Sequence, residues 1–310
     1  MANSINQAPV RMLAVIVLYR MQPGVSEAFR TLRLAKASVQ DRQAEIKILL
    51  YDNTPGGQAV GELPEGVQYK ADPKNGGLAT AYNYALDVAH ESGSDWLLTL
   101  DQDTSLPSDF LCKLCNAAAF VAPMHDVAAI APSISSDGRV VSPFTLTRRW
   151  KLMRHFPEGF LGTTSEITYA INSAFATKVS ALKEIGGYDP RFKLDFCDIV
   201  IGHRLHCHNM RTYVAGNIHV DHELSVFDLK NRVTPQRYED IQRAEEAFYD
   251  EYLGTTEGIA LLSRLVFRLS YKLWKAEATT PYFRVGLRFL YRRLFYSRKH
   301  RMSSWKHVAS

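Results

Sequence analysis

Cysteine is scarce in this sequence, and long apolar runs are missing. The 310 residues include 4 cysteines, too few and too irregularly spaced for the disulfide framework of a secreted protein. The apolar run at 12–19 is far shorter than the roughly 20 residues that a membrane-spanning helix needs. Residues 1–11 lack the basic-then-apolar order of a signal peptide. We therefore expect a cytoplasmic location without a spanning helix.

Acidic residues are nearly missing from the C-terminal segment, 255–310. It holds 12 of the 37 basic residues of the chain but only 2 of its 32 acidic ones, Glu257 and Glu277. The formal net charge of +5 therefore comes from this segment alone, and the rest of the chain is net acidic. This asymmetry predicts a separate basic tail.

Branched apolar runs alternate with segments of helical spacing along the first half of the chain. Such alternation predicts an α/β fold, a mostly parallel sheet with helices on both faces. We expect strands at 12–19, 46–51, 67–69, 95–100, 127–130 and 167–175, and helices at 26–39, 78–90 and 179–185, with another helix opened by Pro107. Asp137-Gly138 predicts a hairpin turn.

Two carboxylates, Asp101 and Asp103, follow the expected strand at 95–100 directly. Ligands of parallel sheets bind at the carboxyl ends of the strands, and hard cations such as Mg²⁺ and Mn²⁺ take oxygen ligands. The pair therefore predicts a metal and phosphate site. Alternatively, the segment is a solvated turn in which Asp103 or Thr104 caps the next helix.

Two further polar segments lie at the end of an expected strand or just before an expected helix. Asp52-Asn53 closes the second expected strand, where the carboxylate could accept hydrogen bonds from a base or ribose, or simply form an Asx turn. Asn75-Gly76-Gly77 lacks bulky side chains, which allows close approach of a ligand to the backbone, although a plain turn before a helix is equally natural.

Several motifs together resemble one family. They are Val15-Ile-Val-Leu-Tyr19, Tyr51-Asp-Asn53, Asn75-Gly-Gly-Leu-Ala-Thr-Ala-Tyr-Asn83, Leu100-Asp-Gln-Asp-Thr104, Ile171-Asn-Ser-Ala-Phe175, Ile185-Gly-Gly-Tyr-Asp-Pro190 and Leu194-Asp-Phe-Cys-Asp-Ile199. Their order and spacing resemble the family 2 glycosyltransferases, which have the GT-A fold, and most of all the bacterial rhamnosyltransferases. The resemblance covers roughly residues 10–243.

The resemblance implies a role for each matching residue. Tyr19 and Asp52 would hold the nucleobase and ribose, and Asp101 and Asp103 the metal and diphosphate. Asp198 falls on the general base, and His222 lies near a histidine that completes metal or diphosphate binding. The remaining donor-side positions are Asn53, Asn75, Gly76, Gly77, Gln102 and Arg204.

The sequence departs from the family at two places. Val200 stands where an acidic residue is usual, and Ser173-Ala174 stands where Ser-Gly is frequent. Asp195 could therefore share or replace the base role of Asp198, or both could cap a helix. His203, His206 and His208 with Cys197 and Cys207 match no tetrahedral zinc spacing.

In the tail, apolar residues recur every three or four positions with cations between them. This pattern is typical of helices that lie on an anionic membrane surface, and also of a helical pair packed on the catalytic domain. No recognised nucleic-acid-binding motif accompanies the charge, so we expect no nucleic-acid partner. The expected domains are 1–254, a catalytic domain with a nucleotide-sugar half at about 1–105 and an acceptor half at 106–254, and the tail at 255–310.

The leading hypothesis is an inverting glycosyltransferase that needs Mg²⁺ or Mn²⁺. The resemblance favours dTDP-rhamnose as donor and a lipid-linked saccharide of a surface polysaccharide as acceptor, with the enzyme peripheral on the inner face of the membrane. The alternatives are a sugar nucleotidyltransferase and a non-catalytic nucleotide-binding or membrane-associated module. The oligomeric state is not determined by the sequence.

Overall fold

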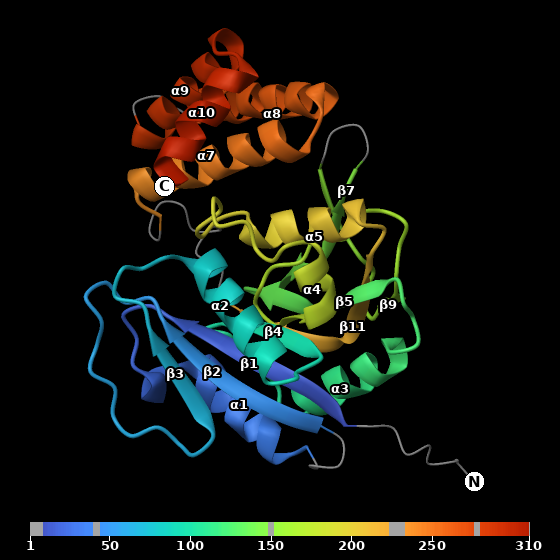
Figure 1. Cartoon of the computed structure of the whole chain (residues 1–310). Helices are drawn as coiled ribbons and strands as arrows, with labels where there is room; N and C mark the ends of the chain where they lie inside the picture. Colours follow the sequence, from blue (N-terminus) through green and yellow to red (C-terminus); the bar gives the residue numbers. More distant parts are fainter. Residues whose placement is uncertain (1–8, 40–43, 148–151, 223–232, 276–279, 310) are drawn as a thin grey trace. The chain divides into compact units, whose positions relative to one another are not determined.

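The computed structural model describes residues 9–39, 44–147, 152–222, 233–275 and 280–309. The chain forms two compact units, each described by itself below (Figure 1). The first unit comprises Met1–Thr145, His155–Tyr188 and Ile201–Glu223, and the second comprises Leu146–Arg154, Asp189–Val200 and Leu224–Ser310.

The first unit contains a mostly parallel sheet, in the order β3-β2-β1-β4-β10-β5-β11-β9. The parallel strands on one side are β1 (Val10–Leu18), β2 (Ala44–Asp52), β3 (Val67–Ala71) and β4 (Trp96–Asp101). On the other side, β5 (Val127–Ser136) runs parallel to β11 (Arg211–Asp221). The antiparallel strands are β10 (Phe175–Lys178), between β4 and β5, with β6 (Arg139–Ser142) on β5 and β9 (Leu161–Gly162) on β11. A short ribbon pairs β7 (Phe144–Leu146) with β8 (Met153–His155).

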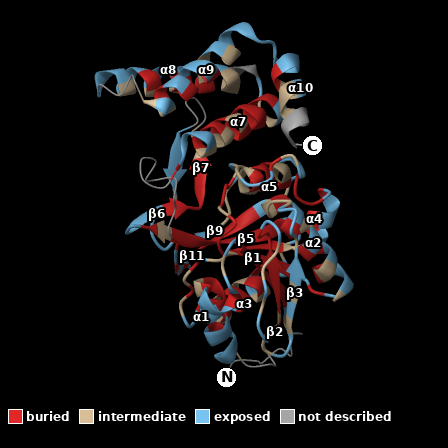
Figure 2. Ribbon diagram, turned by 90° about the vertical axis from the view of Figure 1, so that its left-hand side faces the viewer, coloured by how far each residue is buried: buried red, intermediate tan, exposed pale blue. Residues whose placement is uncertain are grey.

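Helices cover both faces of this sheet. α2 (Leu78–Glu91) and α4 (Val179–Glu184) contact each other on one face, and α1 (Glu27–Ala37) contacts α3 (Phe110–Val121) on the other (Figure 2). β1 is buried from Met12 to Leu18 because side chains on both of its faces meet helices. α1 begins where the Ser26 hydroxyl accepts a hydrogen bond from the Phe29 amide. α5 (Cys197–Cys207) begins in the second unit and continues in the first.

The expected α/β fold is confirmed, and so is the hairpin at Asp137-Gly138, which joins β5 to β6. The strand expected at 167–175 is wrong, because β10 begins only at Phe175. That segment is buried without forming a strand: Tyr169 makes an isolated bridge to Phe144, and Ala174 turns the chain with a φ of 77°. The helix expected from Pro107 begins at Phe110, after Asp109, so neither Asp103 nor Thr104 caps it.

The second unit consists mainly of α7 (Pro235–Tyr252), α8 (Thr255–Trp274), α9 (Pro281–Phe295) and α10 (Arg298–Ala309). The expected basic helical extension is therefore confirmed. α8 and α9 pack closely, since a Cβ on Gly286 would lie 2.9 Å from Leu269 Cδ2. In the described residues, no helix has both the length and the apolarity that crossing a membrane requires.

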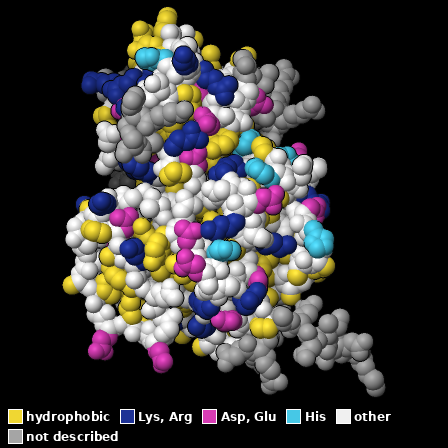
Figure 3. Space-filling view, in the orientation of Figure 1, with side chains coloured by type: hydrophobic (Ala, Val, Ile, Leu, Met, Phe, Trp, Pro, Cys, Tyr) yellow, Lys and Arg dark blue, Asp and Glu magenta, His cyan; other side chains and the backbone are white. Residues whose placement is uncertain are grey.

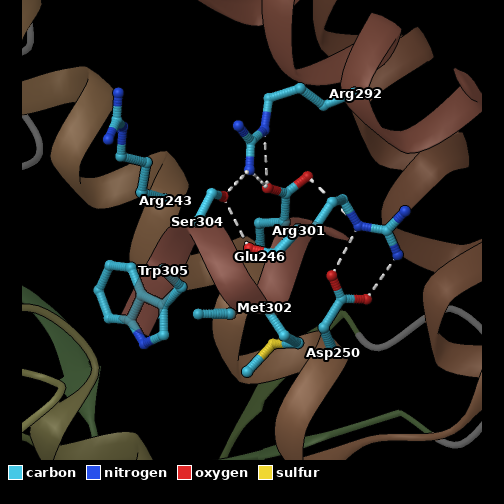
Figure 4. Close-up of a pocket in the computed structure, with 9 residues that line it drawn as sticks. Arg243, Glu246, Asp250, Arg292, Arg301, Met302, Ser304 and Trp305 are labelled. Carbon is cyan, nitrogen blue, oxygen red and sulfur yellow. Dashed lines mark hydrogen bonds and ion pairs between the residues drawn. The ribbon is translucent and has the colours of Figure 1, made fainter. Parts of the chain in front are cut away.

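Most arginines of this extension contact the acidic side chains of α7. Arg264 and Arg268 pair with Glu245, Arg288 with Glu239, Arg292 with Glu246, and Arg293 and Arg301 with Asp250. All four of these acidic residues are buried, and Figure 4 shows Arg292 of α9 directed at Glu246 and Arg301 of α10 directed at Asp250. Burial raises the pKa of Glu245, but Arg268 and Arg264 outweigh it and hold this pKa below its ordinary value.

Candidate active site

Asp101 is the last residue of β4, and the backbone turns there, with the Thr104 amide donating to the Asp101 carbonyl at 3.2 Å. Gln102 fixes the turn. Its carbonyl accepts hydrogen bonds from the Ser26 hydroxyl at 2.8 Å and the Ala28 amide at 3.2 Å. Its side-chain oxygen accepts one from the Tyr19 amide at 2.8 Å. The end of β1 and the start of α1 therefore hold Asp101 and Asp103 at the carboxyl edge of the sheet.

His222 lies between these two carboxylates. It follows β11, and the Ser105 amide donates to the Asp221 carbonyl at 3.0 Å, which brings the end of β11 to the turn after β4. The His222 Nε2 atom lies 3.5 Å from Asp101 Oδ2, and Nδ1 lies 3.4 Å from Asp103 Oδ1. His222 is thus in contact with Asp101 and Asp103, although it lies more than 100 positions after them in the sequence.

These side chains fit a divalent cation by their chemistry. Two carboxylates and a neutral imidazole are ligands that Mn²⁺ accepts, and Nδ1 of the buried His222 makes no hydrogen bond. Within the described residues, however, no three such side chains surround a common point as in a formed metal site. Asp101 and Asp103 instead face different nitrogens of the ring, so binding a cation would require these side chains to rotate.

Ser173 is a residue of this site to which the sequence pattern gave no role. Its hydroxyl donates a short hydrogen bond to Asp101 Oδ2, the oxygen that faces His222. The next residue, Ala174, has a φ of 77°, and its amide donates to the Thr99 carbonyl of β4 at 2.8 Å. A positive φ favours glycine, which explains why Ser-Gly is frequent in the related sequences. The conformation of Ala174 positions the hydroxyl of Ser173.

Asp52 is fully buried at the end of β2. Its Oδ1 accepts the Thr54 amide at 2.9 Å, an Asx turn, and its Oδ2 accepts the Tyr69 hydroxyl at 2.6 Å. Burial, with the hydrogen bond to Asp52, raises the pKa of Tyr69. The neighbouring Asn53 is buried too, and its Oδ1 has no hydrogen-bond partner. Because Asp52 exposes no surface, its contact with a nucleotide stays a prediction.

Tyr19 and the Asn75 loop are accessible. Tyr19 is exposed beside Arg20, whose guanidinium carbon lies 5.2 Å from the centre of the Tyr19 ring. Asn75 has a φ of 53° and Gly77 a φ of 88°, and they lead into α2. A Cβ on Gly76 would lie 2.8 Å from Asp72 Oδ2 and 2.9 Å from Thr80 Cγ2, so a larger residue would have to displace these side chains. The loop is shaped by its own contacts, and its role in ligand binding stays a prediction.

The remaining predicted residues have structural partners. Arg204 donates to the carbonyls of Ile185 and Gly187, and therefore supports the turn at 185–187. In the second unit, Arg237 forms a bidentate ion pair with Asp195. Asp198 lies in the first turn of α5, where its Oδ1 accepts the Ile199 amide at 2.8 Å. The four cysteines are free thiols, and none of the described ones belongs to a metal cluster.

Comparison with known proteins identifies the family of this chain. Residues 26–186, more than half of the chain, match the model of Glycosyl transferase family 2. The chain belongs to this family. The fold is similar to that of GalNAc-T7, crystallised with UDP, GalNAc and Mn²⁺, with a TM-score of 0.52 and 13% identity over 77% of this chain and 50% of that one. The chain therefore spans half of the GalNAc-T7 chain. At this identity, the likeness shows only that both have the GT-A fold.

A second structure, residues 1–349 of S. aureus TarS, has a TM-score of 0.48 and 11% identity over 96% of this chain and 92% of that one. No curated protein matches the sequence.

Proposed function

We propose that this glycosyltransferase is an inverting, metal-dependent enzyme that transfers L-rhamnose from dTDP-rhamnose to a lipid-linked saccharide. The observation that carries the proposal is the cluster of Asp101, Asp103 and His222 at the carboxyl edge of the sheet. A bound Mg²⁺ or Mn²⁺ would neutralise the charge of the departing nucleoside diphosphate. Ser173 would orient Asp101 through its hydrogen bond, as it does in the structure.

The acceptor hydroxyl needs a base as it attacks the sugar, and we assign Asp198 to this role. The alternative, Asp195, is a weaker candidate because Arg237 already contacts both of its oxygens. A single base without an enzyme nucleophile gives inversion at the anomeric carbon. The family resemblance, rather than a distance, supports this assignment.

The donor-side residues Tyr19, Asp52, Asn53 and the 75–77 loop would hold the nucleoside, with Gln102 fixing the turn between the two aspartates. Arg204 would act indirectly, by supporting the 185–187 turn. For Asp52 to reach a nucleotide, the hydrogen bond from Tyr69 would have to open.

We further propose that the enzyme works at the inner face of the cytoplasmic membrane, where lipid-linked saccharides are extended. The division into a nucleotide-sugar half, 1–105, an acceptor half, 106–254, and a tail, 255–310, belongs to the same proposal. The amphipathic sequence of the tail supports it.

A thermal-shift panel of nucleotide sugars with Mn²⁺ tests the donor. A ligand that binds the folded state raises the melting temperature, so dTDP-rhamnose should stabilise the protein selectively and only with metal. Stabilisation by a UDP-sugar instead would refute the donor assignment alone. Release of pyrophosphate from a nucleoside triphosphate would refute transferase activity in favour of a nucleotidyltransferase.

A further inference from the structure

A surface helix usually exposes its charged side chains and buries its apolar ones, but in α8 many of the exposed side chains are apolar and the cations face the rest of the unit. These cations, Arg264, Arg268 and Lys272, are only partly exposed; the arginines pair with Glu245, and Lys272 lies over the rings of Tyr238 and Tyr282. The exposed side chains described in this helix are all uncharged. They are Ile259, Ser263, Val266, Phe267, Ser270, Tyr271, Leu273 and Trp274.

The neighbouring helix, α9, packs against α8 and exposes apolar side chains as well. Leu287, Tyr291, Leu294 and Phe295 are exposed on it. The exposed fractions are large at the aromatic positions, 72% for Phe267, 75% for Trp274 and 68% for Phe295. A group of large exposed apolar side chains on two packed helices is typical of a site of interaction with another molecule or a membrane. We call this surface, the exposed apolar residues of α8 and α9, the apolar face.

Exposed cations lie on these helices or next to them in the sequence, among them Arg288, which pairs with Glu239. Lys275 follows α8, Arg284 lies on α9, and Arg298 and Lys299 begin α10. Figure 3 shows hydrophobic side chains beside lysine and arginine on the visible side of this unit. Two copies that met through this face would bring like charges together, which opposes association. An anionic lipid surface has the complementary charge, and Trp and Tyr favour the interface between headgroups and acyl chains.

We propose that the apolar face of α8 and α9 inserts into the acyl boundary of a membrane, and that most arginines of the tail hold this unit together rather than bind lipid. The proposal rests on the membrane attachment included in the proposed function. It differs from the expectation based on the sequence, in which the cations of the tail supply the attraction. Burial of the apolar side chains supplies most of the free energy of binding, so the binding depends weakly on salt.

Vesicle flotation of the full-length protein tests this proposal. Phosphatidylcholine vesicles, with and without phosphatidylglycerol, are used at about 0.1 M and about 1 M salt, between which the Debye length falls from about 10 Å to about 3 Å. We expect binding to both kinds of vesicle to persist at high salt. Trp274→Glu and Phe267→Glu should each weaken it roughly tenfold or more.

Two matched variants serve as controls. Leu34→Glu adds the same charge at an exposed leucine of α1 and should leave flotation unchanged. Arg284→Gln removes an exposed cation of α9 and should weaken binding about fivefold, on anionic vesicles only. Circular dichroism melting checks that each variant is folded.

Binding that needs anionic lipid, disappears at high salt and is unaffected by Trp274→Glu would overturn the proposal. A dimer in sedimentation that Trp274→Glu converts to a monomer, without vesicle binding, would overturn it as well, because the face would then join two copies. Donor turnover of the same preparations is measured separately. Its absence in the wild type would refute the proposed enzyme without affecting the flotation result.

Discussion

The two units of the molecule use carboxylates in opposite ways. In the first, Asp101 and Asp103 lie partly exposed at a sheet edge on either side of His222, where we propose that they bind a cation. In the second, Glu239, Glu245, Glu246 and Asp250 are buried and contact arginines of the same unit. The difference teaches that the solvent exposure of a carboxylate separates two uses: an accessible carboxylate can accept a ligand, whereas a buried one stabilises the fold through its arginine partners.

The largest expected effect is on kcat, and it distinguishes Asp198 from Asp195, which lies three positions before it. Asp198→Asn removes the proposed base and should lower kcat about a hundred- to ten-thousandfold, with little change in melting temperature. Asp195→Asn should instead lower stability, because it leaves Arg237 without its bidentate partner. Transfer kinetics and thermal melting of both variants measure this. A near-normal kcat for Asp198→Asn would show that the base is assigned wrongly.

A buried acid of the second unit should contribute more to stability than one whose partners reach solvent. Asp250→Ala removes the carboxylate that the nearly buried Arg293 and Arg301 share, and we expect a loss of about 3–5 kcal/mol in the free energy of unfolding. The control is Glu239→Ala, because the partners of Glu239, Arg243 and Arg288, have side chains 35% and 58% exposed. We expect a loss of about 0–1 kcal/mol there. Equal losses in denaturant titrations would contradict the contrast.

Acid should destabilise the second unit. The pKa of Glu245 is lowered in the folded protein, so its contribution to stability is complete above the ordinary value of about 4.3 and is lost as the pH falls through the lowered pKa. Glu246 has a pKa raised by burial and contributes with the opposite sign. Melting temperatures between neutral pH and about pH 3 should therefore fall less in Glu245→Gln than in the wild type. Parallel curves would argue against this prediction.

The smallest expected effect concerns the backbone beside Ser173. Ala174→Gly removes the cost of a positive φ and should stabilise the protein by about 1 kcal/mol. Ala176→Gly in the regular strand β10 is the matched control and should destabilise it by about 0.5–1 kcal/mol. If both changes lower the free energy of unfolding equally in chemical denaturation, backbone strain at Ala174 does not lower the stability of the wild type.

The sequence predicts the sheet well because its central strands, such as β1 and β4, are largely apolar and helices alternate with the strands. It fails at 167–175, where burial comes from an irregular segment whose turn depends on the φ of Ala174. The contact of His222 with both aspartates depends on the pairing of Asp221 with Ser105, a long-range register that no local pattern encodes. The orientation of the tail arginines likewise depends on the acidic side chains of α7, which precedes the tail at 255–310 and does not share its periodicity.

Mn²⁺ binding measured by electron paramagnetic resonance, with a nucleoside diphosphate present, tests the central claim most directly. The account predicts that the wild type binds the ion, and that Asp103→Asn and His222→Gln each weaken this binding at least about tenfold, because each removes one ligand. Glu65→Gln, at an exposed loop position, should bind it as the wild type does. Unchanged Mn²⁺ affinity in Asp103→Asn and His222→Gln would contradict the claim that these side chains form the metal site.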